Sequence, residues 1–161
     1  MSAKPAKPLN PSPHSYLFAA RIAVGCVFIV SGFQKLTQPY QNFLYVVQNF
    51  EVLPEWAEAA VAHAFPWIEL FGGVFLVFGL WTGLMLRLLW LANSAFVVIL
   101  AQAIVRKLPI RDCGCFGEMI RLPLPVMLGF DLGMWLVFGL LVVFERSARR
   151  FGLDNRFDGS S

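Results

Sequence analysis

The sequence predicts an all-α integral membrane protein, a four-transmembrane-helix bundle with a helical extracytoplasmic cap between the first two spans. Composition is the first reason: 58% of the 161 residues are hydrophobic and 14% are charged, whereas a soluble domain carries about 25% charged residues. The second reason is that the chain contains four apolar runs, each close to the ~20 residues that cross a bilayer. No run alternates with the period of a barrel strand, so each is expected to be a helix.

Residues 1–15 are expected to form a disordered leader, because they contain four prolines and no apolar periodicity. Lys4 and Lys7 resemble the basic region at the start of a signal peptide. Arg21 interrupts the apolar run that follows, however, and no clean small-x-small cleavage site is present. We therefore expect a retained first helix rather than a cleaved signal.

The membrane domain is predicted over residues 16–145, followed by a basic cytoplasmic tail at 146–161 that meets anionic lipid headgroups. A nucleic-acid partner is not expected. The four spans are predicted at residues 16–33, 64–81, 86–105 and 124–144. The third span holds three polar residues, Asn93, Ser94 and Gln102.

Ionisable side chains within the spans are expected to face the bundle interior or a partner, because charge in lipid is costly. Arg21 and Glu69 enter from opposite sides of the membrane, so Lys35, at the outer end of the first span, is the better partner for Glu69. Asp131 lies nearer the cysteine-side end of the last span. We expect Lys35, Glu69 and Asp131 to converge beneath the cysteine loop, where they either anchor the loop and tune its thiols or simply fix helix register.

The segment between the first two spans is too long for a turn and is expected to form the helical cap. Apolar residues recur there at i, i+3, i+4 and i+7, as on one helix face: Phe43, Val46, Val47 and Phe50. A second helix is predicted from Pro54, a good first helical residue, with Glu55 and Glu58 suiting the helix dipole. The cap is expected on the side of the cysteines, as a packing element or a docking surface.

Small residues in the spans indicate close helix packing, because they let backbones approach in lipid. Two pairs of glycines are four residues apart, and one pair is adjacent: Gly79 with Gly83, Gly129 with Gly133, and Gly72 with Gly73. These glycines predict helix contacts and no chemistry.

The distribution of Lys and Arg predicts the orientation. The leader side holds seven basic residues: Lys4, Lys7, Arg87, Arg146, Arg149, Arg150 and Arg156. The opposite side holds five: Lys35, Arg106, Lys107, Arg111 and Arg121. The excess places the leader and the tail in the cytoplasm and the cysteine loop outside, where thiols can be oxidised.

Two of the three cysteines, Cys113 and Cys115, flank Gly114 in a short polar stretch between apolar runs. Residues two apart come within disulfide reach, and glycine relaxes the backbone between them. A disulfide across one residue closes too short a loop to be a useful staple and is strained, which favours an exchangeable bond. Arg111 favours the thiolate and Asp112 opposes it, so the neighbouring charges do not predict whether the thiols are reactive.

Other uses of two close thiols stay open. A structural zinc site normally needs four ligands, and beyond the two thiolates only poorer or distant candidates exist: His63, Asp112 and Glu118. Thiolates also select reduced copper, which leaves a copper carrier open, and the pair can be inert residues of a turn. Cys26, inside the first span, is interpreted as a small buried apolar residue without a role.

Three strings, "SGFQKLTQP", "FPWIELFGG" and "CGCFGE", resemble the MauE/DoxX-like membrane proteins, named for methylamine utilisation. The resemblance runs from about Arg21 to Phe144, and Cys-Gly-Cys-Phe-Gly is its most specific piece, which brings Phe116 and Gly117 into the candidate site. It implies a four-span protein of the bacterial inner membrane that supports disulfide formation in, or electron delivery to, an exported thioredoxin-like partner during maturation of a periplasmic dehydrogenase.

The same resemblance gives Cys113 and Cys115 the redox role, and Lys35 and Glu69 match recurrent family positions. Phe130 stands before Asp131 where the family often has a basic residue, which puts a charge relay in that helix in doubt. The chain also lacks the second cysteine pair of a self-contained quinone-linked thiol oxidase. We therefore predict dependence on a partner. No cofactor is predicted, and no motif supports a quinone.

Two function classes follow. One is a membrane component of a thiol-disulfide relay, and the other is a non-enzymatic membrane scaffold or assembly subunit of a redox complex.

Overall fold

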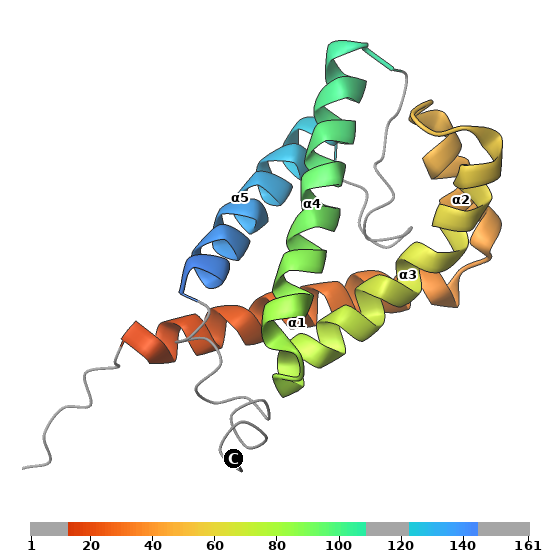
Figure 1. Ribbon diagram of the computed structural model, residues 1–161. Coiled ribbons are helices and arrows are strands. Elements are labelled where there is room, and N and C mark those ends of the chain that lie inside the picture. Colours follow the sequence, from red (N-terminus) through yellow and green to blue (C-terminus); the bar gives the residue numbers. More distant parts are fainter. Residues whose placement is uncertain (1–12, 109–122, 145–161) are drawn as a thin grey trace, which may run out of the picture.

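The computed structural model describes residues 13–108 and 123–144, and these are almost entirely helical (Figure 1). Five helices occur there: α1 (Pro13–Thr37), α2 (Tyr40–Asn49), α3 (Glu55–Phe78), α4 (Thr82–Val105) and α5 (Leu124–Val143). These two ranges contain no strand, and all helices but α2 are long and apolar enough to cross a membrane. The predicted all-α class and the four membrane helices are therefore confirmed.

α3 differs from its predicted boundaries. We expected one helix from Pro54 and a separate span from Ala64, but a single helix runs from Glu55 to Phe78. Pro54 is the extended residue just before the helix, with φ −71° and ψ 152°, rather than its first helical residue. The helix ends at Gly79, whose left-handed backbone (φ 68°) suits glycine and lets its N–H donate to carbonyls of the last turn.

α2 has the predicted apolar face. Phe43 is buried and its ring stacks on that of Phe65 from α3, with centroids 6.3 Å apart. Phe50, which follows the helix, packs into a cluster with residues of α4 and α5: Leu100, Ala103, Leu124 and Met127. The short helix therefore packs on the described bundle, while its position relative to a bilayer stays a prediction.

α1 and α3 lie side by side in close backbone contact (Figure 1). A Cβ added to Gly73 would lie 2.7 Å from the carbonyl oxygen of Gly25, and one added to Gly32 would lie 2.6 Å from the backbone nitrogen of Leu70. Neither contact leaves room for a side chain. The predicted packing role of Gly73 is confirmed, while Gly25 and Gly32 were not predicted; they are seven residues apart, which places both on the same face of α1.

The predicted packing role of Gly129 and Gly133 is wrong for the part of the chain the structure describes, because a Cβ on either would meet no described atom within 4 Å. α5 instead packs on α4 through large side chains on its other faces. Trp135 lies against Trp90 with ring centroids 5.6 Å apart, and Phe138 is fully buried in the main apolar core. Four-residue spacing of glycines does not reveal which face of a helix has a neighbour.

Candidate functional site

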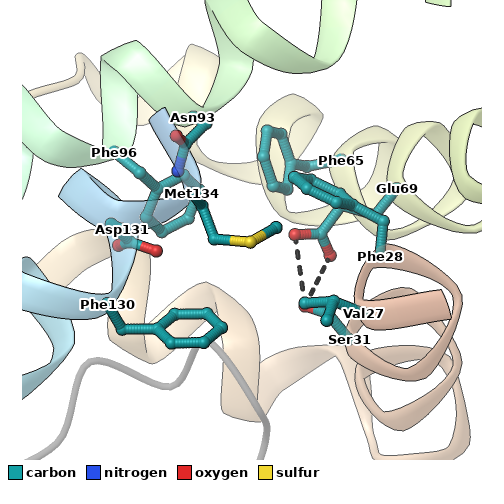
Figure 2. A pocket seen from close by; sticks show the side chains of 10 residues that line it. All are labelled: Val27, Phe28, Ser31, Phe65, Glu69, Asn93, Phe96, Phe130, Asp131 and Met134. Atoms are coloured by element: carbon teal, nitrogen blue, oxygen red, sulfur yellow. Dashed lines mark hydrogen bonds between the residues drawn. The ribbon is translucent and has the colours of Figure 1, made fainter. Parts of the chain in front are cut away.

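A buried ion pair joins the end of α1 to the middle of α3. Lys35 Nζ donates to Glu69 Oε2 and to Ser31 Oγ, each at 2.7 Å. The Ser31 hydroxyl in turn lies 3.3 Å from both oxygens of Glu69, to which it donates (Figure 2). All three side chains are buried, so the predicted pairing of Lys35 with Glu69 is confirmed.

The local sequence explains how these three side chains meet. Ser31 and Lys35 are one helical turn apart, so both point from the same face of α1. Gly32 lies between them and lets α3 approach until its backbone is in contact. Lys35 is also in the last turn of α1, where a positive charge suits the helix dipole.

Aromatic rings complete the surroundings of Lys35. Its ammonium nitrogen lies 5.4 Å from the ring centroid of Phe43 on α2 and 6.0 Å from that of Phe65 on α3. Rings at such distances attract a cation through their negative faces. The ammonium group thereby links α1, α2 and α3, which favours the interpretation that the pair fixes helix register; an effect on the thiols stays a prediction.

A small pocket of about 40 Å³ lies beside this pair, lined by residues of α1, α3, α4 and α5 (Figure 2). Its lining combines apolar and aromatic side chains with four polar ones. The residues are Val27, Phe28, Ser31, Phe65, Glu69, Asn93, Phe96, Phe130, Asp131 and Met134.

Asp131 and Asn93 bring unsatisfied oxygens to the pocket. Asp131 is 8% exposed and Asn93 6%, and neither Asp131 Oδ2 nor Asn93 Oδ1 has a hydrogen-bond partner among the described residues. Figure 2 shows both side chains on the far side of Met134 from Glu69. Asp131 and Glu69 line the same pocket and Lys35 is bonded to Glu69, so these three residues lie near one another as expected. The cysteine loop, beneath which they were predicted to converge, lies outside the described residues.

Asn93 was not predicted to belong to a site. The sequence carried a signal for it, since a polar residue inside an apolar span tends to face the interior. Which other helix it faces depends on the crossing of α4 over α1 and α3, which hydropathy does not report. Arg21, by contrast, is buried away from this pocket's lining, with its guanidinium 5.1 Å from the ring centroid of Phe18.

The cysteine loop itself lies outside the described residues. This holds for seven predicted site residues: Arg111, Asp112, Cys113, Gly114, Cys115, Phe116 and Gly117. The segment follows the C-terminal end of α4 and precedes the start of α5. Both of these points contact the connection between α2 and α3. Arg106, just after α4, pairs with Glu51 at 2.7 Å, and Phe50 contacts the cluster that contains Leu124.

Cys26 is exposed on α1 and forms no disulfide within the described segments. Its interpretation as a buried apolar residue is therefore wrong, because the first span turns this residue away from α3. Among residues 13–108 and 123–144, no three His, Cys, Asp or Glu side chains are placed to hold a metal ion. This statement does not cover the thiols of Cys113 and Cys115, which lie outside those residues.

Four long apolar helices with charged and polar groups buried between them define a multi-pass membrane protein. The family model described as methylamine utilisation protein MauE matches residues 13–144. The chain therefore belongs to the MauE family, which confirms the resemblance found in its motifs.

Two relatives are similar to this chain. The methylamine utilization protein MauE of Paracoccus denitrificans is 32% identical over 115 residues, which cover 70% of this chain and 60% of the relative. The protein of the same name from Methylorubrum extorquens is 32% identical over 102 residues, covering 62% of this chain and 55% of the relative. The matched region is thus less than two thirds of each relative. No solved structure matches the chain.

Proposed function

We propose that this chain is a component of the bacterial inner membrane that serves methylamine utilisation through thiol-disulfide exchange at Cys113 and Cys115. Its partner is an extracytoplasmic thioredoxin-like protein. The observation that carries the proposal is the Cys-Gly-Cys sequence in the connection between α4 and α5, inside the region that matches the MauE family. Both relatives named above are methylamine utilization proteins.

The exchange needs no cofactor on this chain. A thiolate of the pair attacks a disulfide sulfur of the partner, so that bond breaks, a mixed disulfide forms, and the other partner sulfur leaves as a thiolate and takes up a proton. The second thiolate of the pair then displaces the bound partner sulfur. Two electrons pass to the partner, and a Cys113–Cys115 disulfide remains. The same steps in reverse oxidise the partner.

The described residues on either side of the loop in the sequence support this role. Phe50 and Leu124 share one apolar cluster with the last turns of α4, and Arg106 is paired with Glu51. Packing thus holds the points where the loop begins and ends, which favours presenting two thiols at a defined place. Trp56, 80% exposed at the start of α3, offers an aromatic contact for a partner or for lipid headgroups.

Trapping of the mixed disulfide tests the proposal. Cys115→Ser and Cys113→Ser are each introduced into full-length protein that also carries Cys26→Ala, since the exposed Cys26 would otherwise form unrelated adducts. We expect a covalent adduct, cleaved by reductant, from at least one single variant and none from the variant lacking both thiols. Cys26→Ala alone is the matched control and should keep growth on methylamine.

Two results would contradict the relay. If neither single variant forms an adduct and both support growth on methylamine, the loop only shapes a docking surface and the chain is a scaffold. If neither forms an adduct, growth is lost, and the purified protein binds one Cu(I) through both thiols, the chain is a copper carrier.

A further inference from the structure

The pocket beside the Lys35–Glu69 pair presents two hydrogen-bond acceptors that have no donor among the described residues. Asp131 Oδ2 and Asn93 Oδ1 are its unsatisfied polar atoms within the described chain, and both side chains are more than nine-tenths buried. A buried acceptor without a partner costs free energy. An occupant with N–H or O–H groups would remove that cost.

Charge around the pocket also favours a positive occupant. The pocket lining carries two carboxylates, Glu69 and Asp131, and no basic side chain. The single ammonium nearby, that of Lys35, is already bonded to Glu69 and Ser31. Lys35 and Glu69 balance each other as an ion pair, so the Asp131 carboxylate adds a negative charge that a cation would neutralise.

The walls distinguish an organic cation from an inorganic one. Four phenyl rings line the pocket, those of Phe28, Phe65, Phe96 and Phe130. Hard metal cations require six or more oxygen ligands, which this lining does not supply. Alkylammonium ions, in contrast, place carbon against apolar and aromatic surface and direct N–H groups at oxygen.

Size narrows the class further. A cavity of about 40 Å³ holds about three water-sized groups, at ~10–15 Å³ each. That admits a cation of two or three non-hydrogen atoms. A quinone fits the polar groups poorly, because its carbonyl oxygens would face the acceptor oxygens of Asp131 and Asn93 rather than donors.

We propose that this pocket binds a small primary alkylammonium ion. Its N–H groups donate to Asp131 Oδ2 and Asn93 Oδ1, and its alkyl carbon lies among the phenyl rings. The site is separate from the thiol pair and does not depend on the exchange chemistry. Lys35 and Ser31 hold Glu69 beside the pocket and are positioning residues.

Equilibrium binding of radiolabelled methylammonium to the purified full-length protein, at constant ionic strength, tests the assignment. We expect saturable binding of one ion per chain. Ethylammonium should compete, because it has the same N–H donors and one more carbon. Tetramethylammonium has no N–H group and is larger than the pocket volume, so it should not compete. Sodium should not compete either, because the pocket offers it too few oxygen ligands. This series uses the unaltered protein and needs no variant to fold.

Variants then locate the binding. Asp131→Asn keeps the shape and removes the charge, and should weaken methylammonium binding at least about tenfold, as expected for a lost hydrogen bond to a charged group. Asn93→Leu should weaken it by a smaller factor. Glu51→Gln removes an exposed carboxylate outside the pocket and should leave affinity unchanged.

Three results would overturn the assignment. The first is absence of saturable binding, which would mean that the pocket holds water only. The second is equal competition by tetramethylammonium, and the third is wild-type affinity in an Asp131→Asn variant that elutes and folds like the wild type. The variant lacking Cys113 and Cys115 should bind methylammonium normally, so failure of the relay and failure of this site are distinguishable.

Discussion

Two ion pairs among the described residues have the same nitrogen–oxygen distance and opposite exposure to solvent, which allows a comparison of their contributions to stability. Lys35–Glu69 and Arg106–Glu51 both measure 2.7 Å. The first pair is 1% and 7% exposed at its two side chains, and the second is 42% and 61% exposed. Burial is therefore the main difference between the two pairs.

Glu69→Gln should destabilise the protein far more than Glu51→Gln. Removal of Glu69's charge leaves the buried Lys35 ammonium without the carboxylate bonded to it, and breaking a buried pair in this way costs about 3–5 kcal/mol. Loss of an exposed pair costs about 0.2–1 kcal/mol. The free energy of unfolding in mixed micelles, from a detergent titration followed by tryptophan fluorescence, measures both changes.

The double variant Lys35→Met/Glu69→Gln distinguishes the cost of an unpaired buried charge from any cost of replacing the carboxylate by an amide. It removes both charges, so much of the lost stability should return relative to Glu69→Gln alone. The reasoning is refuted if Glu69→Gln costs no more than Glu51→Gln, or if the double variant is less stable than the sum of the two single losses.

Three further predictions use the same protein. Gly32→Ala should lower the free energy of unfolding by about 1–3 kcal/mol through overpacking, because its Cβ would meet backbone atoms of α3. Gly133 faces open space, so Gly133→Ala should leave the free energy of unfolding unchanged or raise it by up to about 1 kcal/mol. The detergent titration measures both changes. Phe43→Leu should destabilise by about 0.5–2 kcal/mol by removing a ring beside Lys35, which a double-mutant cycle with Lys35→Met checks. A membrane-impermeant thiol reagent should label Cys113 and Cys115 in spheroplasts after reduction, and labelling only after lysis would reverse the predicted orientation.

The features that follow from the lipid surroundings of the protein were predictable from the sequence. Lipid demands long apolar helices, so the four spans follow from composition and run length alone. The pairing of Lys35 with Glu69 was also predictable, because both lie toward the same membrane side and a charge in a span needs a partner. The start of α3 was not, since residues 55–63 are less apolar than the span yet continue its helix.

Features that depend on how the helices cross were not predictable. Gly129 and Gly133 have the four-residue spacing that favours helix contact, but only the fold shows that this face of α5 has no described neighbour. Asn93 and Asp131 come from different helices, and their meeting at one pocket requires the relative rotation of α4 and α5. The predicted chemistry of the cysteine loop stays a prediction.

The bond between α1 and α3 also has a consequence for biogenesis. Glu69 lies toward one end of its span, where a charge costs less than the ~3 kcal/mol that translocon insertion scales give at a helix centre but still disfavours insertion. When α1 has already entered the bilayer, Lys35 and Ser31 meet that carboxylate as α3 arrives. An α1 already in the bilayer would thus offset part of the cost of inserting α3, which makes the order of synthesis relevant to assembly.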